Sequence, residues 1–397
     1  MNHRYLTFAF LCLTTITVCA QQDPWYKRTL MKLKTFADSS VVQGVDRRYI
    51  ALPDKPWRVI ANTNVNEMDL RVKTKNRDLI AGNLEMNFST HVDPPLSTSV
   101  GLWFGYRGFG LGYSISLLKQ PGLNMSFNIA TPKYGIGLRY RRFKTDNLKM
   151  QVELGGYRNL ADPDSYVPLL KLGGEQELTS PATIQSFILD GYWAFNSKRF
   201  SIAAAYDQSM RQLRSAGSVI AGITFHQQII DYRDISNAEL IEISNGIGCV
   251  KLYQLNLGCG YTYNWVPAKG WLINFMAMPT ISTLNRIKAY YFDSNYSIFA
   301  SPAYGQYAKV GKKEYPDDND LIGLLEQNNT QMLWPTGKES NYSQVHFNVD
   351  CRVAVSYWLH NYFFSVVGQY NQFQYHHDDS KVRLNDWYIN ASIGYTF

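Results

Sequence analysis

A two-residue period runs through most of the sequence after Trp57 and restricts its fold more than any other feature. In 344–358, hydrophobic side chains occupy every second position from Val345 to Tyr357, and mostly polar side chains occupy the positions between them. Successive side chains of a β-strand point to opposite faces, so this segment has one apolar and one polar side. The segments 251–265 and 386–397 repeat the pattern. The sequence therefore predicts an all-β protein with long strands.

Three details favour a transmembrane antiparallel β-barrel over a soluble β-sandwich. Many segments approach or exceed the ~9–11 residues that cross a bilayer, whereas strands of globular sheets usually have ~5–6. In 251–265, aromatic residues lie at the ends of the apolar face and Leu255 and Leu257 lie between them, as in interfacial girdles. The chain also ends on Phe397, the last residue of an apolar stripe, which we expect the barrel-assembly machinery to bind. A secreted β-sandwich that acts as a binding module remains an alternative.

Thirteen segments have strand character, and their connections alternate between short and long. The candidates are roughly 57–73, 97–107, 109–118, 123–131, 134–144, 183–195, 199–211, 217–230, 251–265, 270–283, 344–358, 361–375 and 386–397. The long connections fall near 145–182, 231–250, 284–343 and 376–384. Two turns on the same side must be separated by an even number of strands, but three lie between the turns at 196–199 and 267–270. We therefore expect about 12–14 strands, with fourteen preferred.

The N-terminus resembles a secretory signal peptide. Arg4 precedes an apolar run from Leu6 to Val18, and Ala20 follows it. Cys19 would suggest a lipoprotein, but the bulky Val18 does not fit that signal. No later segment offers ~18 consecutive apolar residues for a membrane helix. We expect a signal peptide at 1–20, a periplasmic segment at 21–56 and a barrel at 57–397.

Charge and cysteine content narrow the range of partners. The chain has 39 Lys and Arg against 32 Asp and Glu, but the basic residues are scattered singly and an exported protein seldom meets nucleic acid. We therefore expect no nucleic-acid partner. After the signal peptide only Cys249, Cys259 and Cys351 remain, which is no disulfide framework. Cys249 and Cys259 would lie ~33 Å apart on a straight strand, so we expect them to be unpaired.

Neither a metal site nor an enzyme is predicted. His376 to Asp379 form the most metal-like cluster, but adjacent residues of a strand point apart and no third ligand is indicated. His346, Asp350 and Ser356 share a strand face, yet four residues span ~13 Å, too far for a catalytic triad. No cofactor is expected. A lipid-modifying barrel enzyme remains an alternative function.

Charged side chains on the polar faces are the candidate functional residues. The lumen-facing candidates are Arg139, Arg141, Asp190, His346, Asp350 and Arg352. Opposite charges that face one lumen are least costly when they are paired or hydrated. These residues therefore fit either a water-filled channel for small solutes or a filled, ion-paired interior.

The long connection 284–343 contains an acidic run followed by apolar residues. Asp317 to Asp320 would cap a short helix that carries Leu321, Ile322, Leu324 and Leu325. A polar outer loop has little reason to carry such a cluster unless it packs against something. We expect this segment to restrict the barrel mouth. Deletion of residues 312–336 should therefore increase the ion current that the barrel conducts across a planar bilayer.

Two stretches resemble the signature segments of a known family. They are Tyr49-Ile50-Ala51-Leu52-Pro53 followed by Trp57, and Lys198-Arg199-Phe200-Ser201 continuing to Arg214-Ser215-Ala216-Gly217-Ser218. They are similar to domain of unknown function 4421, and the similarity covers roughly 40–397. The resemblance implies an exported Bacteroidetes protein that forms a barrel in the outer membrane of a Gram-negative bacterium, in contact with lipid and lipopolysaccharide. It implies no catalytic residues. The expected function is a channel, a passive transporter or a structural barrel.

Overall fold

A computed structural model describes residues 25–42, 44–52, 54–76, 84–92, 97–117, 122–146, 148–157, 166–174, 178–238, 241, 246–294, 309–310, 313–314, 333–377 and 380–397. The chain divides into two units, Met1–Gln43 and Gly44–Phe397. The first contains the helix α2 (Trp25–Val42), in which Met31 and Phe36 are exposed. Among the described residues, no helix is long and apolar enough to span a membrane.

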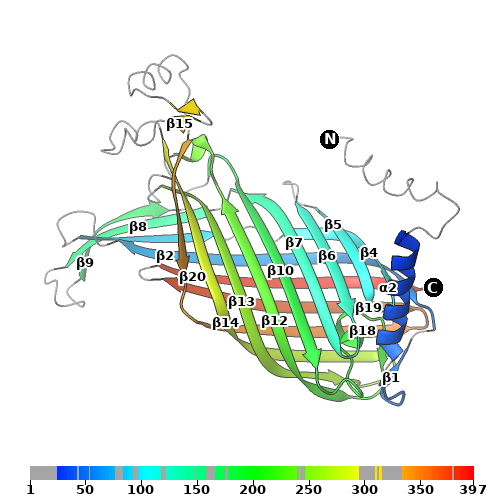
Figure 1. The fold of residues 1–397 in the computed structure, drawn as a ribbon. Helices are drawn as coiled ribbons and strands as arrows, with labels where there is room; N and C mark the ends of the chain where they lie inside the picture. The colour runs from blue at the N-terminus through cyan, green and yellow to red at the C-terminus, as the bar shows by residue number, and fades with distance from the viewer. Residues whose placement is uncertain are drawn as a thin grey trace. The chain divides into compact units, whose positions relative to one another are not determined.

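The second unit is a closed antiparallel β-barrel of twelve strands (Figure 1). In ring order they are β2 (Trp57–Asn76), β4 (Ser97–Tyr106), β5 (Phe109–Ser116), β6 (Leu123–Ala130), β7 (Tyr134–Thr145), β10 (Ala182–Ala194), β12 (Ala216–Asp231), β13 (Ile247–Trp265), β14 (Trp271–Ser294), β18 (Phe347–Leu359), β19 (Tyr362–His377) and β20 (Ser380–Thr396). The ring closes where β20 pairs with β2, from Arg58↔Thr396 to Thr74↔Ser380. This closure confirms the predicted barrel and excludes the β-sandwich, because a sandwich leaves sheet edges open.

The preferred number of fourteen strands was wrong, and the error lies in 199–211. This segment is not a barrel strand but contains the helix α3 (Ile202–Tyr206) and the two-residue strand β11 (Arg211–Gln212). The Ser201 side chain accepts a hydrogen bond from the Ala204 N–H and caps the helix, and three consecutive alanines favour it. Only β12 and β13 therefore lie between the turns at 196–199 and 267–270, which satisfies the even-number rule.

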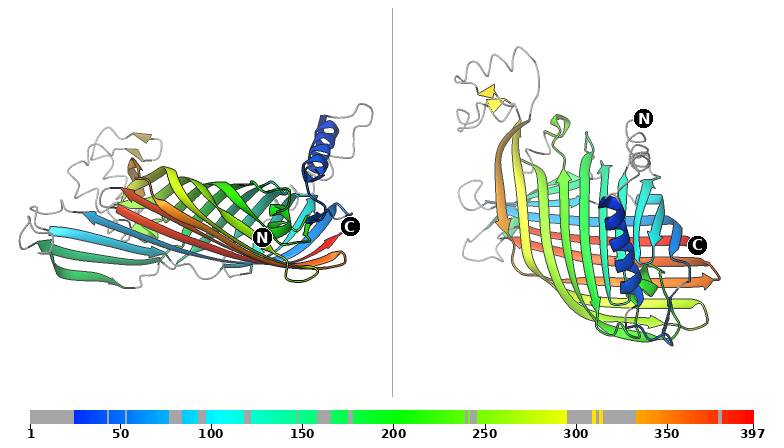
Figure 2. Two further views of the ribbon diagram at one scale, coloured as in Figure 1. Left: turned by 90° about the horizontal axis from the view of Figure 1, so that it is seen from below. Right: turned by 45° about the vertical axis from the view of Figure 1, so that its right-hand side comes forward.

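The two ends of the barrel differ in their connections. We call the end that carries the following turns the near end and the opposite end the far end. At the near end, residues 107–108 join β4 to β5, residues 131–133 join β6 to β7, and residues 360–361 join β18 to β19. At the far end, β3 (Leu84–Val92), β8 (Leu148–Tyr157) and β9 (Tyr166–Gly174) extend the sheet from β2 beyond the ring (Figure 2).

Further strands lie in the connection between β14 and β18. The strand β17 (Leu333–Tyr342) pairs with the far part of β14, and β15 (Lys309–Val310) pairs with β16 (Lys313–Glu314). The sequence did not predict β3, β8, β9 or β17 as strands. The predicted helix from Asp317 to Leu325 lies outside the described residues.

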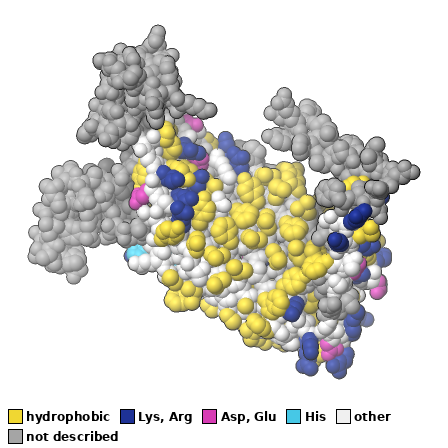
Figure 3. Space-filling model, in the orientation of Figure 1, with side chains coloured by type: hydrophobic (Ala, Val, Ile, Leu, Met, Phe, Trp, Pro, Cys, Tyr) yellow, Lys and Arg dark blue, Asp and Glu magenta, His cyan; other side chains and the backbone are white. Residues whose placement is uncertain are grey.

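The outer face of the barrel carries an apolar band. Leu257, Ile281 and Ile223 are each more than 40% exposed near the middle of their strands. Figure 3 shows this band on one face, with Lys and Arg side chains beyond its edges at both ends of the barrel. The free Cys259 and Cys351 lie on this outer side, whereas the free Cys249 is buried.

Candidate functional site

The near mouth of the barrel is closed by a plug made of residues 44–52 and 195–215. Its two parts pair through β1 (Ile50–Ala51) and β11, and the Leu213 N–H donates to the Tyr49 carbonyl at 2.7 Å. The side chains of α3 are packed: Phe200 and the three alanines 203–205 have no exposed surface. These are largely the residues that carry the family resemblance, so the signature segments build the plug.

Buried polar contacts hold the plug against the barrel wall. Arg58 of β2 forms an ion pair with Asp207 at 2.8 Å, and both side chains are only 2% exposed. The same guanidinium donates to the backbone carbonyls of Asp207 and Arg107 and lies 4.8 Å from the Trp103 ring centre. On the opposite wall, the Asn264 amide donates to the Ser201 carbonyl at 3.1 Å. The plug is therefore held by contacts with both walls of the barrel.

A first set of side chains crosses the lumen beyond the plug, and Arg352 is its centre. Its guanidinium lies 2.9 Å from Asp190 of β10 and 3.8 Å from Asp350 of its own strand. It also hydrogen-bonds the Tyr192 hydroxyl and lies 4.2 Å from the centre of that ring. The Tyr192 hydroxyl donates in turn to Asp350. This network, the Arg352 layer, joins β18 to β10.

A second set crosses further out and contains Arg141 and Arg139 of β7. Arg141 pairs with Asp386 of β20 at 2.5 Å and donates to the Asn66 side chain at 3.2 Å. Arg139 lies 5.3 Å from the ring centre of Tyr388, also on β20. β7 and β20 lie on different sides of the ring, separated by four strands on one side and six on the other. We refer to this set as the Arg141 layer.

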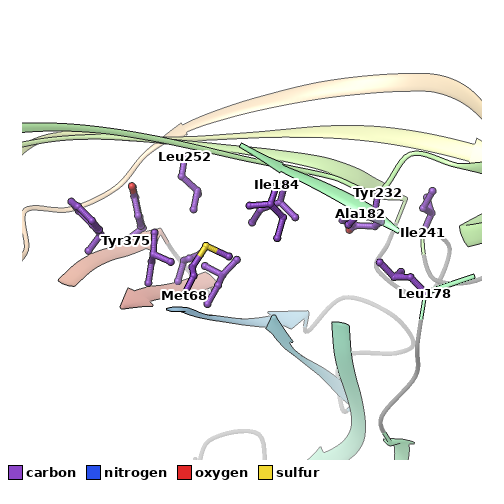
Figure 4. Close-up of a cluster of buried hydrophobic side chains, with 13 residues drawn as sticks. Met68, Leu178, Ala182, Ile184, Tyr232, Ile241, Leu252 and Tyr375 are labelled. Atoms are coloured by element: carbon purple, nitrogen blue, oxygen red, sulfur yellow. The ribbon is translucent and has the colours of Figure 1, made fainter. Parts of the chain in front are cut away.

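The far part of the lumen is filled by apolar side chains, the apolar layer. Its buried members are Met68, Leu70, Leu178, Ala182, Ile184, Ile230, Tyr232, Ile241, Leu252, Phe373, Tyr375, Val382 and Leu384. Most of them come from β2, β19 and β20 on one side and from β10, β12 and β13 on the other, and Leu178, Tyr232 and Ile241 come from the connections that flank β10 and β12. Figure 4 shows Met68 and Tyr375 facing Leu252 and Ile184 across the interior. The ring of His226 stacks on that of Phe373 with centroids 4.1 Å apart.

Two cavities lie in the described part of the lumen. One of 140 Å³ lies between the plug and the Arg352 layer and is lined by Tyr206, Asp207 and Arg352 among others. Another of 30 Å³ adjoins Arg141. Both spaces are large enough to hold water.

The structure places five of the six predicted candidates in these layers. The side chains that face the lumen are those of Arg139, Arg141, Asp190, Asp350 and Arg352. These residues form three ion pairs, and in two of them the partners are 160 or more positions apart in the sequence. His346 lies elsewhere, in a far-end pocket of 610 Å³ that is lined mainly by outward-facing residues of β2, β19 and β20 and also by Tyr375 and Val382 of the apolar layer. Sequence reasoning placed Asp207 on a polar strand face but did not single it out as a site residue, and it gave no signal for its partner Arg58.

His346 does not belong to a catalytic arrangement with Asp350 and Ser356. Its Nε2 lies 3.3 Å from the Ser343 hydroxyl, but that hydroxyl donates to the His376 carbonyl at 2.6 Å. Asp350 instead contacts Tyr192 and Arg352 in the lumen. Within the described residues, no group of three or more His, Cys, Asp or Glu side chains is arranged to hold a metal ion. The side chains of residues 377–379 lie outside the described part.

Three groups outside the barrel strands have displaced pKa values. The side chain and backbone N–H of Arg48 hydrogen-bond to Asp46 and lower its pKa to about 2. Burial raises the pKa of Tyr206, whose protonated hydroxyl donates to Asn274. Burial, and secondarily the charge of His376, lower the pKa of His346.

Comparison with known proteins identifies a family but no activity. A family model described as domain of unknown function (DUF4421) matches residues 45–397. No curated protein matches the sequence.

Several solved structures align over most of the chain. The translocator domain of the autotransporter NalP from Neisseria meningitidis has a TM-score of 0.32 and 7% identity, covering 94% of this chain and 96% of that one. An outer membrane channel from Pseudomonas putida F1 has a TM-score of 0.25 and 8% identity, covering 88% and 98%. The toluene transporter TodX of P. putida has a TM-score of 0.24 and 7% identity, covering 90% and 94%.

Proposed function

Because this chain belongs to the domain of unknown function 4421 family, whose description assigns no activity, we propose a function from its own geometry. The protein is an outer-membrane barrel with a filled lumen that anchors an extended far-end sheet at the cell surface. It is a structural barrel rather than a constitutively open channel. The observation that carries this proposal is that opposite walls meet at the plug and in three further layers.

The membrane position and orientation of the proposal follow from the barrel's surface. Its exterior is an apolar band flanked by aromatic residues, an arrangement typical of barrels in bacterial outer membranes. In such barrels short turns face the periplasm and longer connections face outward. The near end with the plug is then periplasmic, as is segment 21–56, and residues 1–20 are a cleaved signal peptide.

A filled lumen distinguishes this protein from a porin of the same strand number. Barrels with eight strands are narrow enough for wall side chains to fill, and the diameter grows with strand number. A twelve-stranded barrel therefore needs additional material to close its lumen. The plug supplies that material at the near end, and long side chains such as Arg352, Arg141 and Tyr375 supply it further along.

Planar-bilayer recordings of the purified full-length protein test this proposal. We expect little or no current from the native protein and from a variant lacking 312–336, since the filling lies in the barrel itself. A current that appears only after the deletion would overturn the filled-barrel proposal and indicate a channel that is gated by this segment. A large steady current from the native protein would show that the lumen is open and would overturn the proposal. A known porin in the same bilayers controls for insertion.

A further inference from the structure

The outer face of β19, β20 and β2 changes from apolar to strongly basic near the far end. Strand pairing places outward side chains in rows across these strands. One row contains Tyr370, Trp387 and Glu67, and the next contains Gln372, Asn385 and Asp69. Beyond these lie a row with Gln374, Arg383 and Arg71 and a row with His376, Lys381 and Lys73.

The two outermost rows place like charges directly opposite each other. Arg71 pairs with Arg383, and Lys73 pairs with Lys381. Lys381 also has His376 as its partner on the other side. Like charges at directly opposite positions destabilise a sheet unless an anion lies between them.

The protein supplies little compensating negative charge at this place. Asp69 is the carboxylate that lines the pocket, and it is shared between Arg71 at 3.2 Å and His91 at 2.7 Å. In the described ranges, no carboxylate oxygen lies within 4 Å of the charged groups of Lys73, Lys381 or Arg383. These three side chains point to the outside.

The basic residues surround a real depression in the surface. The 610 Å³ pocket is lined by Arg71, Lys73, Lys381 and Arg383 together with His346 and His376. Trp387 marks the aromatic edge of the apolar band and lies four residues after Arg383 along β20, roughly 13 Å along the strand. The pocket therefore lies just beyond the hydrocarbon region, at the depth of lipid headgroups.

We propose that this pocket binds the phosphate groups of a lipopolysaccharide molecule in the outer leaflet. The assignment rests on the proposed orientation, in which the far end faces the cell exterior. The Arg71 and Arg383 guanidinium groups are suited to paired hydrogen bonds with phosphate oxygens, and Lys73 and Lys381 add point charges. The acyl chains of the same molecule would then pack against Tyr370, Trp387 and the apolar band below.

Binding of defined lipids to the detergent-solubilised full-length protein tests the proposal. Native mass spectrometry compares lipopolysaccharide, its enzymatically dephosphorylated form and phosphatidylethanolamine, and inorganic phosphate serves as a competitor. We expect binding of lipopolysaccharide at least tenfold tighter than of the other two lipids, and no displacement by millimolar phosphate. Equal binding of the dephosphorylated form would overturn the proposal. Full displacement by inorganic phosphate would show a phosphate site without lipid specificity.

A matched pair of variants separates this pocket from a diffuse basic surface. Lys381→Gln with Arg383→Gln removes two charges from the pocket and should weaken lipopolysaccharide binding tenfold or more. Lys251→Gln with Lys288→Gln removes a like-charged pair from the far ends of β13 and β14 and should change binding less than twofold. Equal losses in the two variants would exclude the pocket as the site.

The melting temperature distinguishes a loss of lipopolysaccharide binding from a loss of folding. In the absence of lipopolysaccharide, Lys381→Gln with Arg383→Gln relieves repulsion and should raise the melting temperature. Added lipopolysaccharide should raise that of the native protein but not that of the variant. A variant that melts lower than the native protein without lipid would contradict the inferred repulsion. Conductance measures the filled lumen separately, so a failure of lipopolysaccharide binding can be distinguished from a failure of the filled-lumen proposal.

Discussion

Arginine is the residue on which the interior of this barrel depends. Arg58, Arg141 and Arg352 each contact an acidic side chain contributed by a different element. A guanidinium presents five donors in a rigid fork, so one side chain can contact several partners at once. A buried charge that loses its partner strongly destabilises the fold, so each of these arginines requires its acidic partner.

The Arg58–Asp207 pair gives the first prediction. Arg58→Met leaves the nearly fully buried Asp207 carboxylate without its cation and should lower the free energy of unfolding by about 3–5 kcal/mol. The double variant Arg58→Met with Asp207→Asn should lose less than the sum of the two single changes. Urea unfolding in detergent, followed by tryptophan fluorescence, measures these values. Additive losses would mean that the two residues do not interact.

A surface pair serves as the control for this experiment. Arg48 and Asp46 also form an ion pair at 2.8 Å, but the Arg48 side chain is 73% exposed. Exposed pairs contribute little because solvent screens them. Arg48→Met should therefore leave the unfolding curve nearly unchanged, and a loss comparable to that of Arg58→Met would argue against a special role for burial.

The lowered pKa of His346 predicts a pH effect near the far-end pocket. Because its folded pKa lies below the ordinary 6.5, protonation favours states in which this side chain is released. The packing of 343–346 against His376 should be intact at neutral pH and weaken as the pH falls below about 6.5. Hydrogen exchange of this segment in lipid-free detergent measures the change. The variant His346→Gln should show no such dependence, and an equal dependence would assign it to another group.

At the scale of elements, one short segment determines the strand count. Residues 199–211 can alternate as a strand, yet they form α3 and a short pairing with β1 inside the near mouth. Burial of Phe200 and the alanines, together with the Ser201 cap, outweighs local β propensity. The long strands behave differently because their outer faces require lipid and their inner faces require partners.

The outer face of β13 gives the prediction at this scale. Leu257 lies near the middle of the apolar band, paired with Ile223 and Ile281. Leu257→Arg should lower the free energy of unfolding in lipid bilayers by about 2–4 kcal/mol, because it places a charge near the bilayer midplane. Gln227→Arg, at the height of Tyr253 on neighbouring β12, should cost only about 0–1 kcal/mol. Similar losses would mean that the band does not lie in the hydrocarbon.

At the scale of the whole molecule, the plug and the cross-lumen layers close the barrel in series. The plug closes the near mouth, the Arg352 and Arg141 layers cross the middle, and the apolar layer fills the far part. We expect removal of one layer to leave the others in place.

Because the plug and the layers close the lumen one after another, we expect the ion current to depend on how many of them a variant removes. Replacement of 199–214 by a short Gly-Ser turn should leave the conductance low, and so should Leu252→Ala with Phe373→Ala. Their combination, with Arg352→Ala, should give measurable single-channel currents in planar bilayers. A large current from the plug deletion alone would show that the inner layers do not seal the lumen. Heat-modifiable migration on gels checks that each variant remains a folded barrel.

The sequence by itself determined the class of fold and the facing of most side chains, whereas the tertiary structure decided how the lumen is used. Alternation is a local property, because side chains of one strand point to opposite faces whatever the rest of the chain does. Arg352, Asp190, Arg141 and Asp386 could thus be assigned to the polar face from their neighbours alone. Their pairing could not, because it joins strands that only ring closure brings opposite each other. The plug and the basic pocket around Arg383 also depend on tertiary structure, since each is formed by residues that are distant in the chain.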